Sequence, residues 1–227
     1  MVSMAKFANI YDLACKRHGE QKIVGMVAAS KPKSATELSA IPDHRWLSQA
    51  TKCVFQAGFN WKVIEAKWNG FEQAFEGFDI GRWTLANDDD IAELTTNKQI
   101  VRNPQKIKTV PVNAKFFGEI SAKHGGFGSW IANSSVTERN LLLEVLNKRG
   151  SRLGAMTGQY FLRFMGADCY ILSRDVTAAL VREGVVDKQP TSKKAFAQVQ
   201  DAFNQWIEES GHGLTQISRV LAHSISA

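Results

Sequence analysis

Apolar residues recur at three- and four-residue spacing along most of this chain, which is typical of amphipathic helices. The runs that show it are Phe7/Ile10/Leu13/Ala14, Trp46/Leu47/Ala50/Val54, Ile107/Val110/Ala114/Phe117/Ile120, Phe196/Val199/Phe203/Trp206 and Ile217/Val220/Leu221. Helix starts are indicated by capping boxes at 34–37 and 135–138, by Asp43 as an N-cap, and by the acidic run 87–90. No alternating run exceeds four residues and no Asn-Gly hairpin signal occurs. We therefore predict an all-α fold of about ten helices.

The chain lacks internal repeats, low-complexity tracts and long linkers, so residues 1–227 are expected to form a single helical domain. Two polar, proline-containing segments, 31–34 and 188–194, are the best candidates for loops. The second loop sets apart a C-terminal helical extension, residues 190–227.

Composition narrows the class of protein. The 227 residues are 44% hydrophobic and carry a net charge of +6, which fits a polyanionic partner without requiring one. Three widely spaced cysteines argue against a disulfide framework and for a reducing compartment. We expect no membrane span, since no stretch reaches 18 apolar residues, and no signal peptide, since the N-terminal segment lacks an apolar h-region. The cytoplasm is the expected location.

A basic, glycine-rich segment lies between two predicted helices at 146–160. The residues expected to contact DNA there are Lys148, Arg149, Gly150, Arg152 and Thr157. Glycines allow close backbone approach, free N–H groups at a helix start bind phosphate, and cations supply sequence-independent affinity for DNA. The segment therefore predicts a helix-hairpin-helix-like phosphate grip; a tight turn with a solvated basic rim is the alternative.

Three further places carry candidate chemistry. The first is the segment 56–61, where Gln56, Phe59 and Trp61 surround a glycine between two helical segments. The second is a basic helix start with Arg102, Asn103 and Lys106, which suits a contact to the DNA backbone or is simply solvated. The third is Asp175 near a helix start, which is either an N-cap or a carboxylate that stabilises an oxocarbenium-like sugar or activates water.

Taken in order, these segments resemble the 3-methyladenine DNA glycosylase I family of the helix-hairpin-helix superfamily. The matching pieces are 56–61, 71–79, 100–103 with Lys106-Ile107 and Asn113-Ala114, and 148–150 with Thr157 and Tyr160, so the resemblance covers residues 45–180. It implies a two-lobed all-α enzyme of base-excision repair that binds double-stranded DNA. Such an enzyme flips an alkylated purine such as 3-methyladenine and hydrolyses its N-glycosidic bond without a cofactor.

The resemblance also implies roles for single residues. Trp61 would form the electron-rich wall of the base pocket, with Phe59 and Gln56 nearby; a core aromatic between two helices is the alternative for Trp61. Cys53 stands where the family has a glutamate that contacts the base, so recognition differs or another acid substitutes: Glu65, Glu72 or Asp175.

The family's zinc ligands near the C-terminus have no counterpart around 175–179, so we expect no metal. Asp175, or Ser173 in a shifted register, lies where the wider superfamily places its catalytic aspartate, which the glycosylase I family itself lacks. No lyase lysine is evident, so a monofunctional enzyme is expected; a monomer is expected as well. Two alternatives stay open: a non-catalytic, damage-binding relative, and a helical protein unrelated to nucleic acid.

Overall fold

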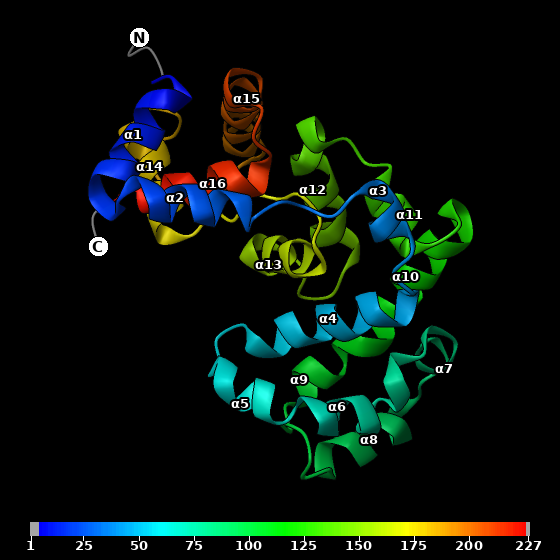
Figure 1. Cartoon of the computed structure of the whole chain (residues 1–227). Coiled ribbons are helices and arrows are strands. Elements are labelled where there is room, and N and C mark those ends of the chain that lie inside the picture. Colours follow the sequence, from blue (N-terminus) through cyan, green and yellow to red (C-terminus); the bar gives the residue numbers. More distant parts are fainter. Residues whose placement is uncertain (1–4, 226–227) are drawn as a thin grey trace. The chain divides into compact units, whose positions relative to one another are not determined.

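The structure is a computed structural model that describes residues 5–225, apart from the side chain of Ala155. Throughout this part of the chain the only regular elements are helices, α1 to α16, with two 3₁₀ turns, η1 and η2 (Figure 1). The prediction of an all-α fold is confirmed, but the helices outnumber the predicted ten. The difference comes from short helices such as α9 and α3, four and five residues long, which are too short to show a hydrophobic period.

Contacts divide the chain into two compact units. Unit 1 comprises residues 5–33, 135–142 and 166–225, and unit 2 comprises 34–134 and 143–165. Helix α12 (Arg139–Arg149) continues from one unit into the other.

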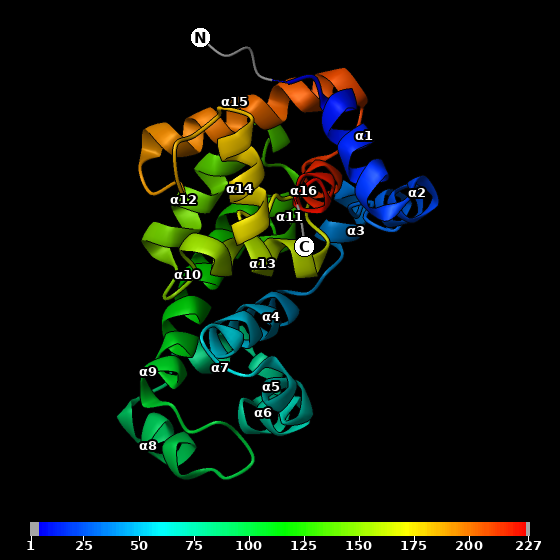
Figure 2. The ribbon, with the colours of Figure 1, turned by 90° about the vertical axis from the view of Figure 1, so that its left-hand side faces the viewer.

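Unit 1 is built from both ends of the chain. Its helices are α1 (Phe7–His18), α2 (Glu20–Ala28), α14 (Arg174–Arg182), α15 (Lys193–Ser210) and α16 (Leu214–His223), with η2 (Val136–Glu138). Helix α16 packs against α1, α2 and α14 (Figure 2). The indole N–H of Trp206 donates to the Ala5 carbonyl over 3.1 Å, and the Phe7 N–H donates to Glu209 over 2.6 Å. The C-terminal extension is therefore packed onto the N-terminal helix.

Unit 2 holds most of the candidate site residues. Its helices are α3 (Ala35–Ser39), α4 (Asp43–Gln56), α5 (Trp61–Ala66), α6 (Trp68–Ala74), α7 (Ile80–Thr84), α8 (Asp88–Thr96), α9 (Pro104–Ile107), α10 (Thr109–His124), α11 (Phe127–Ala132), the end of α12 and α13 (Ala155–Met165), with η1 (Glu76–Phe78). Helix α4 packs against α10 and α13. The predicted stripes of α4 and of α9–α10 are buried, and Trp46, Phe117, Phe127 and Phe161 form the aromatic core between them.

Two predicted helix starts need correction. Asp43 is the first residue of α4 rather than its N-cap, which is Pro42, and its carboxylate accepts from the Phe127 N–H over 2.9 Å at the start of α11. Ser135 caps the 3₁₀ turn η2 through Thr137 instead of forming a capping box with Glu138. The capping box at 34–37 is confirmed, and the acidic run 87–90 lies at the start of α8, where Asn87 and Asp90 form a further box.

Candidate functional site

The predicted hairpin is present and tightly built. Helix α12 ends at Arg149 and α13 begins at Ala155. A Cβ on Gly150 would lie 2.7 Å from the Leu146 carbonyl oxygen, so only glycine fits there without movement. The buried side chain of Asn113 on α10 accepts from the Ser151 N–H over 2.7 Å and donates to the Ser151 carbonyl over 3.2 Å. These two bonds fix the turn against α10.

The cations of the hairpin lie at the surface, each with a polar neighbour. Lys148 pairs with Glu144 one helical turn away. Arg149 pairs with Glu119 over 2.6 Å, and Arg152 donates to Gln105 over 2.9 Å. Exposed ion pairs such as those of Lys148 and Arg149 contribute little to stability.

A cavity of about 370 Å³ adjoins the hairpin. Its lining residues are Val54, Ala57, Asn147, Gly150, Arg152, Gly154 and Thr157, so three of the predicted DNA-contacting residues share one hollow.

The basic helix start at 102–106 differs from the expectation in one respect. Arg102 is exposed, and Asn103 caps α9 by accepting from the Lys106 N–H over 3.1 Å. Lys106, however, is only 8% exposed, and its ammonium donates to the carbonyls of Phe55 over 3.0 Å and Ala57 over 2.7 Å. Burial, and secondarily the nearby Arg152 charge, lowers the pKa of Lys106. Its predicted contact with DNA stays a prediction.

Aromatic side chains gather at the start of α5. Asn60 caps this helix through the Lys62 N–H over 3.0 Å, and Trp61 is its first residue. The Trp61 ring makes edge contacts with Tyr160 and Phe164 of α13, with centroids 5.4 and 5.9 Å apart. Trp61 is 42% exposed, whereas a core tryptophan would be covered.

Phe59 is also exposed. No role for Phe164 follows from the sequence alone, although its four-residue spacing from Tyr160 places both rings on one helix face.

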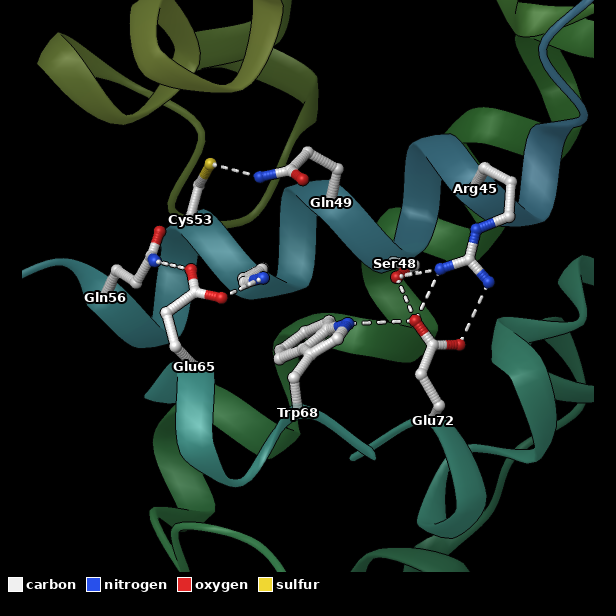
Figure 3. Close-up of polar contacts among 9 residues, drawn as sticks. Arg45, Ser48, Gln49, Cys53, Gln56, Glu65, Trp68 and Glu72 are labelled. Atoms are coloured by element: carbon white, nitrogen blue, oxygen red, sulfur yellow. Dashed lines mark hydrogen bonds and ion pairs between the residues drawn. The ribbon is translucent and has the colours of Figure 1, made fainter. Parts of the chain in front are cut away.

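The polar groups around Cys53 lie on α4 and α5 (Figure 3). Burial raises the pKa of the Cys53 thiol to about 12, although Gln49 donates to its sulfur over 3.4 Å. The amide nitrogen of Gln56 donates to Glu65 over 3.0 Å, and Lys52 pairs with Glu65 over 2.6 Å. The thiol is therefore neutral at physiological pH, and Glu65 already has two partners.

Glu72 belongs to a separate network that joins α6 to α4 (Figure 3). Its carboxylate forms an ion pair with Arg45 and accepts from Ser48 over 2.6 Å and from the Trp68 indole over 2.9 Å. Burial raises the pKa of Glu72, but the hydrogen bonds from Arg45, Ser48 and Trp68 outweigh it, so the net pKa lies below its usual value. These contacts give Glu72 a structural function.

Asp175 lies in unit 1, in the first turn of α14, and is exposed. It is not the N-cap: the Ser173 hydroxyl fills that place and accepts from the Val176 N–H over 3.3 Å. Its catalytic role stays a prediction, as does its use as a substitute acid.

Among the described residues no group of three or more His, Cys, Asp or Glu side chains is placed to hold a metal ion. Within the same residues no helix is long and apolar enough to cross a membrane.

Comparison with solved structures defines the fold class. The chain is similar to the 8-oxoguanine DNA glycosylase of Thermotoga maritima (15% identity, 95% of each chain, TM-score 0.58). It is also similar to the 8-oxoguanine glycosylase/lyase of Methanocaldococcus jannaschii in complex with DNA (14% identity, 94% of this chain and 93% of that one, TM-score 0.57). The fold is thus that of the helix-hairpin-helix DNA glycosylases.

A family model matches the middle of the chain. Residues 47–149 match the model of the methyladenine glycosylase family. The 3-methyladenine DNA glycosylase I of Staphylococcus aureus is 20% identical, over 59% of this chain and 87% of that one, with a TM-score of 0.49. Over residues 47–149 the chain is thus similar to the methyladenine glycosylase family, as the resemblance predicted.

Proposed function

We propose that this protein is a monofunctional DNA N-glycosylase that flips an alkylated purine such as 3-methyladenine out of double-stranded DNA and releases it by hydrolysis. The observation that carries the proposal is the aromatic wall in which exposed Trp61 and Phe164 flank half-buried Tyr160, in the same unit as the glycine-rich basic hairpin. An exposed tryptophan edge-packed on two rings is ready to stack on a flipped base.

Release of an N3-methylated adenine needs little acid catalysis. An N3-methylated adenine is cationic, so it is already a good leaving group, and the electron-rich face of an indole attracts it. The hairpin cations and backbone hold the phosphates, which offsets the few kcal/mol that flipping costs. Asp175 is the proposed carboxylate that stabilises the developing positive charge on the sugar or activates water.

The test is a mass-spectrometric analysis of the bases released from duplex DNA treated with a methylating agent. Release of 3-methyladenine above that in enzyme-free and heat-inactivated controls is the expected result. A duplex containing 8-oxoguanine is included, because the fold is shared with glycosylases of that lesion. Absence of any released base at micromolar enzyme, with DNA binding intact, would refute the proposal.

A non-catalytic, damage-binding protein is the second candidate. It is favoured by the buried, neutral Cys53 at the position of the family's base-contacting glutamate and by the prior engagement of Glu65. Tighter binding to methylated than to unmethylated duplex, without base release, would support this candidate over the enzyme.

A further inference from the structure

The side chain of Lys106, a residue of α9, caps the C-terminus of another helix, α4. Its ammonium donates to the carbonyls of Phe55 and Ala57, at the C-terminus of α4. The last carbonyls of a helix lack donors within the helix and carry its negative dipole end. A buried cation at this position satisfies two of these carbonyls at once. Lys106 is thus a C-terminal cap supplied from 49 to 51 residues further along the chain.

The backbone that holds Lys106 is itself constrained. Pro104 begins α9, Asn103 caps it, and the Thr109 hydroxyl donates to the Lys106 carbonyl over 2.6 Å. Ile107, the next residue, is fully buried. The ammonium is therefore delivered from a fixed point and not from a mobile surface chain.

The two capped carbonyls flank Gln56 and lead directly into the segment that bears the aromatic wall. Gly58 follows with a φ of 67°, and the Phe59 N–H donates back to the Gln56 carbonyl over 3.1 Å. The direction in which the chain leaves α4 determines where Phe59 and Trp61 lie. Lys106 holds the start of that turn.

On its other side Lys106 is close to the hairpin. The Arg152 charge is near enough to lower the pKa of Lys106, and Arg152 donates to Gln105, the residue before it. Arg152 has a φ of 60°, in the left-handed region that residues other than glycine seldom adopt. One buried lysine therefore lies next to both the phosphate-binding turn and the aromatic segment.

We propose that Lys106 is a positioning residue: it fixes the Gln56–Trp61 segment relative to the hairpin and does not bind a DNA phosphate. This inference rests on the proposed function and deepens it. It also replaces the contact between Lys106 and DNA that the sequence suggested.

The test compares three variants with the wild-type protein. Lys106→Met removes the ammonium and keeps the apolar stem. Lys108→Met is the matched control, because Lys108 is an exposed lysine two residues away at the end of α9. Arg152→Met serves as the reference for a lost phosphate contact. The measurements are the salt dependence of affinity for duplex DNA, the single-turnover rate of base release at saturating DNA, and hydrogen exchange of the amides of residues 56–61.

The three variants are expected to differ in which of the measured quantities changes. Lys106→Met keeps the wild-type salt slope, lowers the saturating rate roughly 10- to 100-fold, as small misplacements in active sites do, and accelerates exchange at 56–61. Lys108→Met keeps the wild-type saturating rate and exchange. Arg152→Met loses about 0.9 of the log–log salt slope, as one phosphate contact requires. Should Lys106→Met fail to fold, Lys106→Gln, whose amide still donates to one carbonyl, is expected to give an intermediate rate and exchange.

Two results overturn the inference: a slope that falls by about 0.9 in Lys106→Met with an unchanged saturating rate, or unchanged exchange at 56–61. If the wild-type protein releases no base, the proposed function fails. Hydrogen exchange and the salt slope then still show whether Lys106 positions the segment 56–61 or binds a DNA phosphate.

Discussion

Replacing Trp61 with alanine tests whether this residue forms a wall of the base pocket or is a core aromatic. Trp61 is 42% exposed and makes two edge contacts, whereas Trp83 in the same unit is 1% exposed and its indole donates to the Phe75 carbonyl. Truncating a buried tryptophan costs about 3–5 kcal/mol of folding stability. Two aromatic pairs of about 0.5–1.5 kcal/mol each set the scale for Trp61→Ala at about 1–3 kcal/mol.

The effect on base release is expected to be larger than the effect on folding. Stacking of a base on an aromatic ring contributes about 1–3 kcal/mol, and attraction of a cation to the indole face about 0.5–2 kcal/mol. A combined loss of about 1.5–5 kcal/mol corresponds to roughly a 10- to 5,000-fold lower rate of release. Neutral bases, which lack the cation–π contribution, are expected to lose less than 3-methyladenine.

Two assays test this pair of expectations. Urea titration gives the free energy of unfolding of Trp61→Ala, with Trp83→Ala as the matched core variant. Single-turnover release of 3-methyladenine at saturating DNA gives the rate. A Trp61→Ala protein that loses as much stability as Trp83→Ala, yet releases base at the wild-type rate, would show that Trp61 is a packing residue and that the base pocket lies elsewhere.

Three further predictions concern acidic groups. Cys53→Glu places a carboxylate where the resemblance implies a base-contacting glutamate, and it is expected to raise release of cationic 3-methyladenine at least about tenfold relative to a neutral base, measured by competition; an unchanged ratio would place Cys53 away from the base. Glu72→Gln removes bonds to Arg45 and is expected to destabilise the fold at neutral pH by about 1.5–3 kcal/mol in urea titrations. Because the folded-state pKa of Glu72 is lowered, this difference is present above its unfolded pKa and disappears as the pH falls through the folded value; a pH-independent difference would contradict the account. Asp175→Asn is expected to slow release about 10²–10⁴-fold with less than about 1 kcal/mol change in stability, and a wild-type rate would remove Asp175 from the mechanism.

The long helices of this fold were predictable because burial imposes a period on their sequences. Val110, Phe117 and Ile120 of α10 are buried at the spacing that predicted them. The glycine hairpin was predictable for a related reason. Close packing at Gly150 leaves no room for a Cβ, so the residue type itself reports the geometry.

Contacts between distant residues were not predictable. No local pattern marks Lys106 as a cap for α4, since its neighbours predict only a basic helix start, and its partners are about fifty residues earlier. Asp43 was assigned to its own helix because capping rules are local, yet its carboxylate serves the Phe127 N–H across the unit. Such contacts depend on tertiary packing, which a single sequence does not display.

The replacement of the family's glutamate by Cys53 bears on how a cationic base would be distinguished. A carboxylate buried as deeply as this thiol would need its own partner, and the neighbouring acid Glu65 is held by Lys52 and Gln56. With a neutral thiol, the proposed pocket attracts positive charge only through the ring faces around Trp61. That attraction is worth about 0.5–2 kcal/mol, less than the roughly 4 kcal/mol that a carboxylate 4 Å away supplies at an effective dielectric of 20. Under the proposed function, selection would shift from the charge of the base to its shape and its readiness to leave, so the protein is expected to accept a broader range of labile purines than a pocket with the glutamate that the resemblance implies.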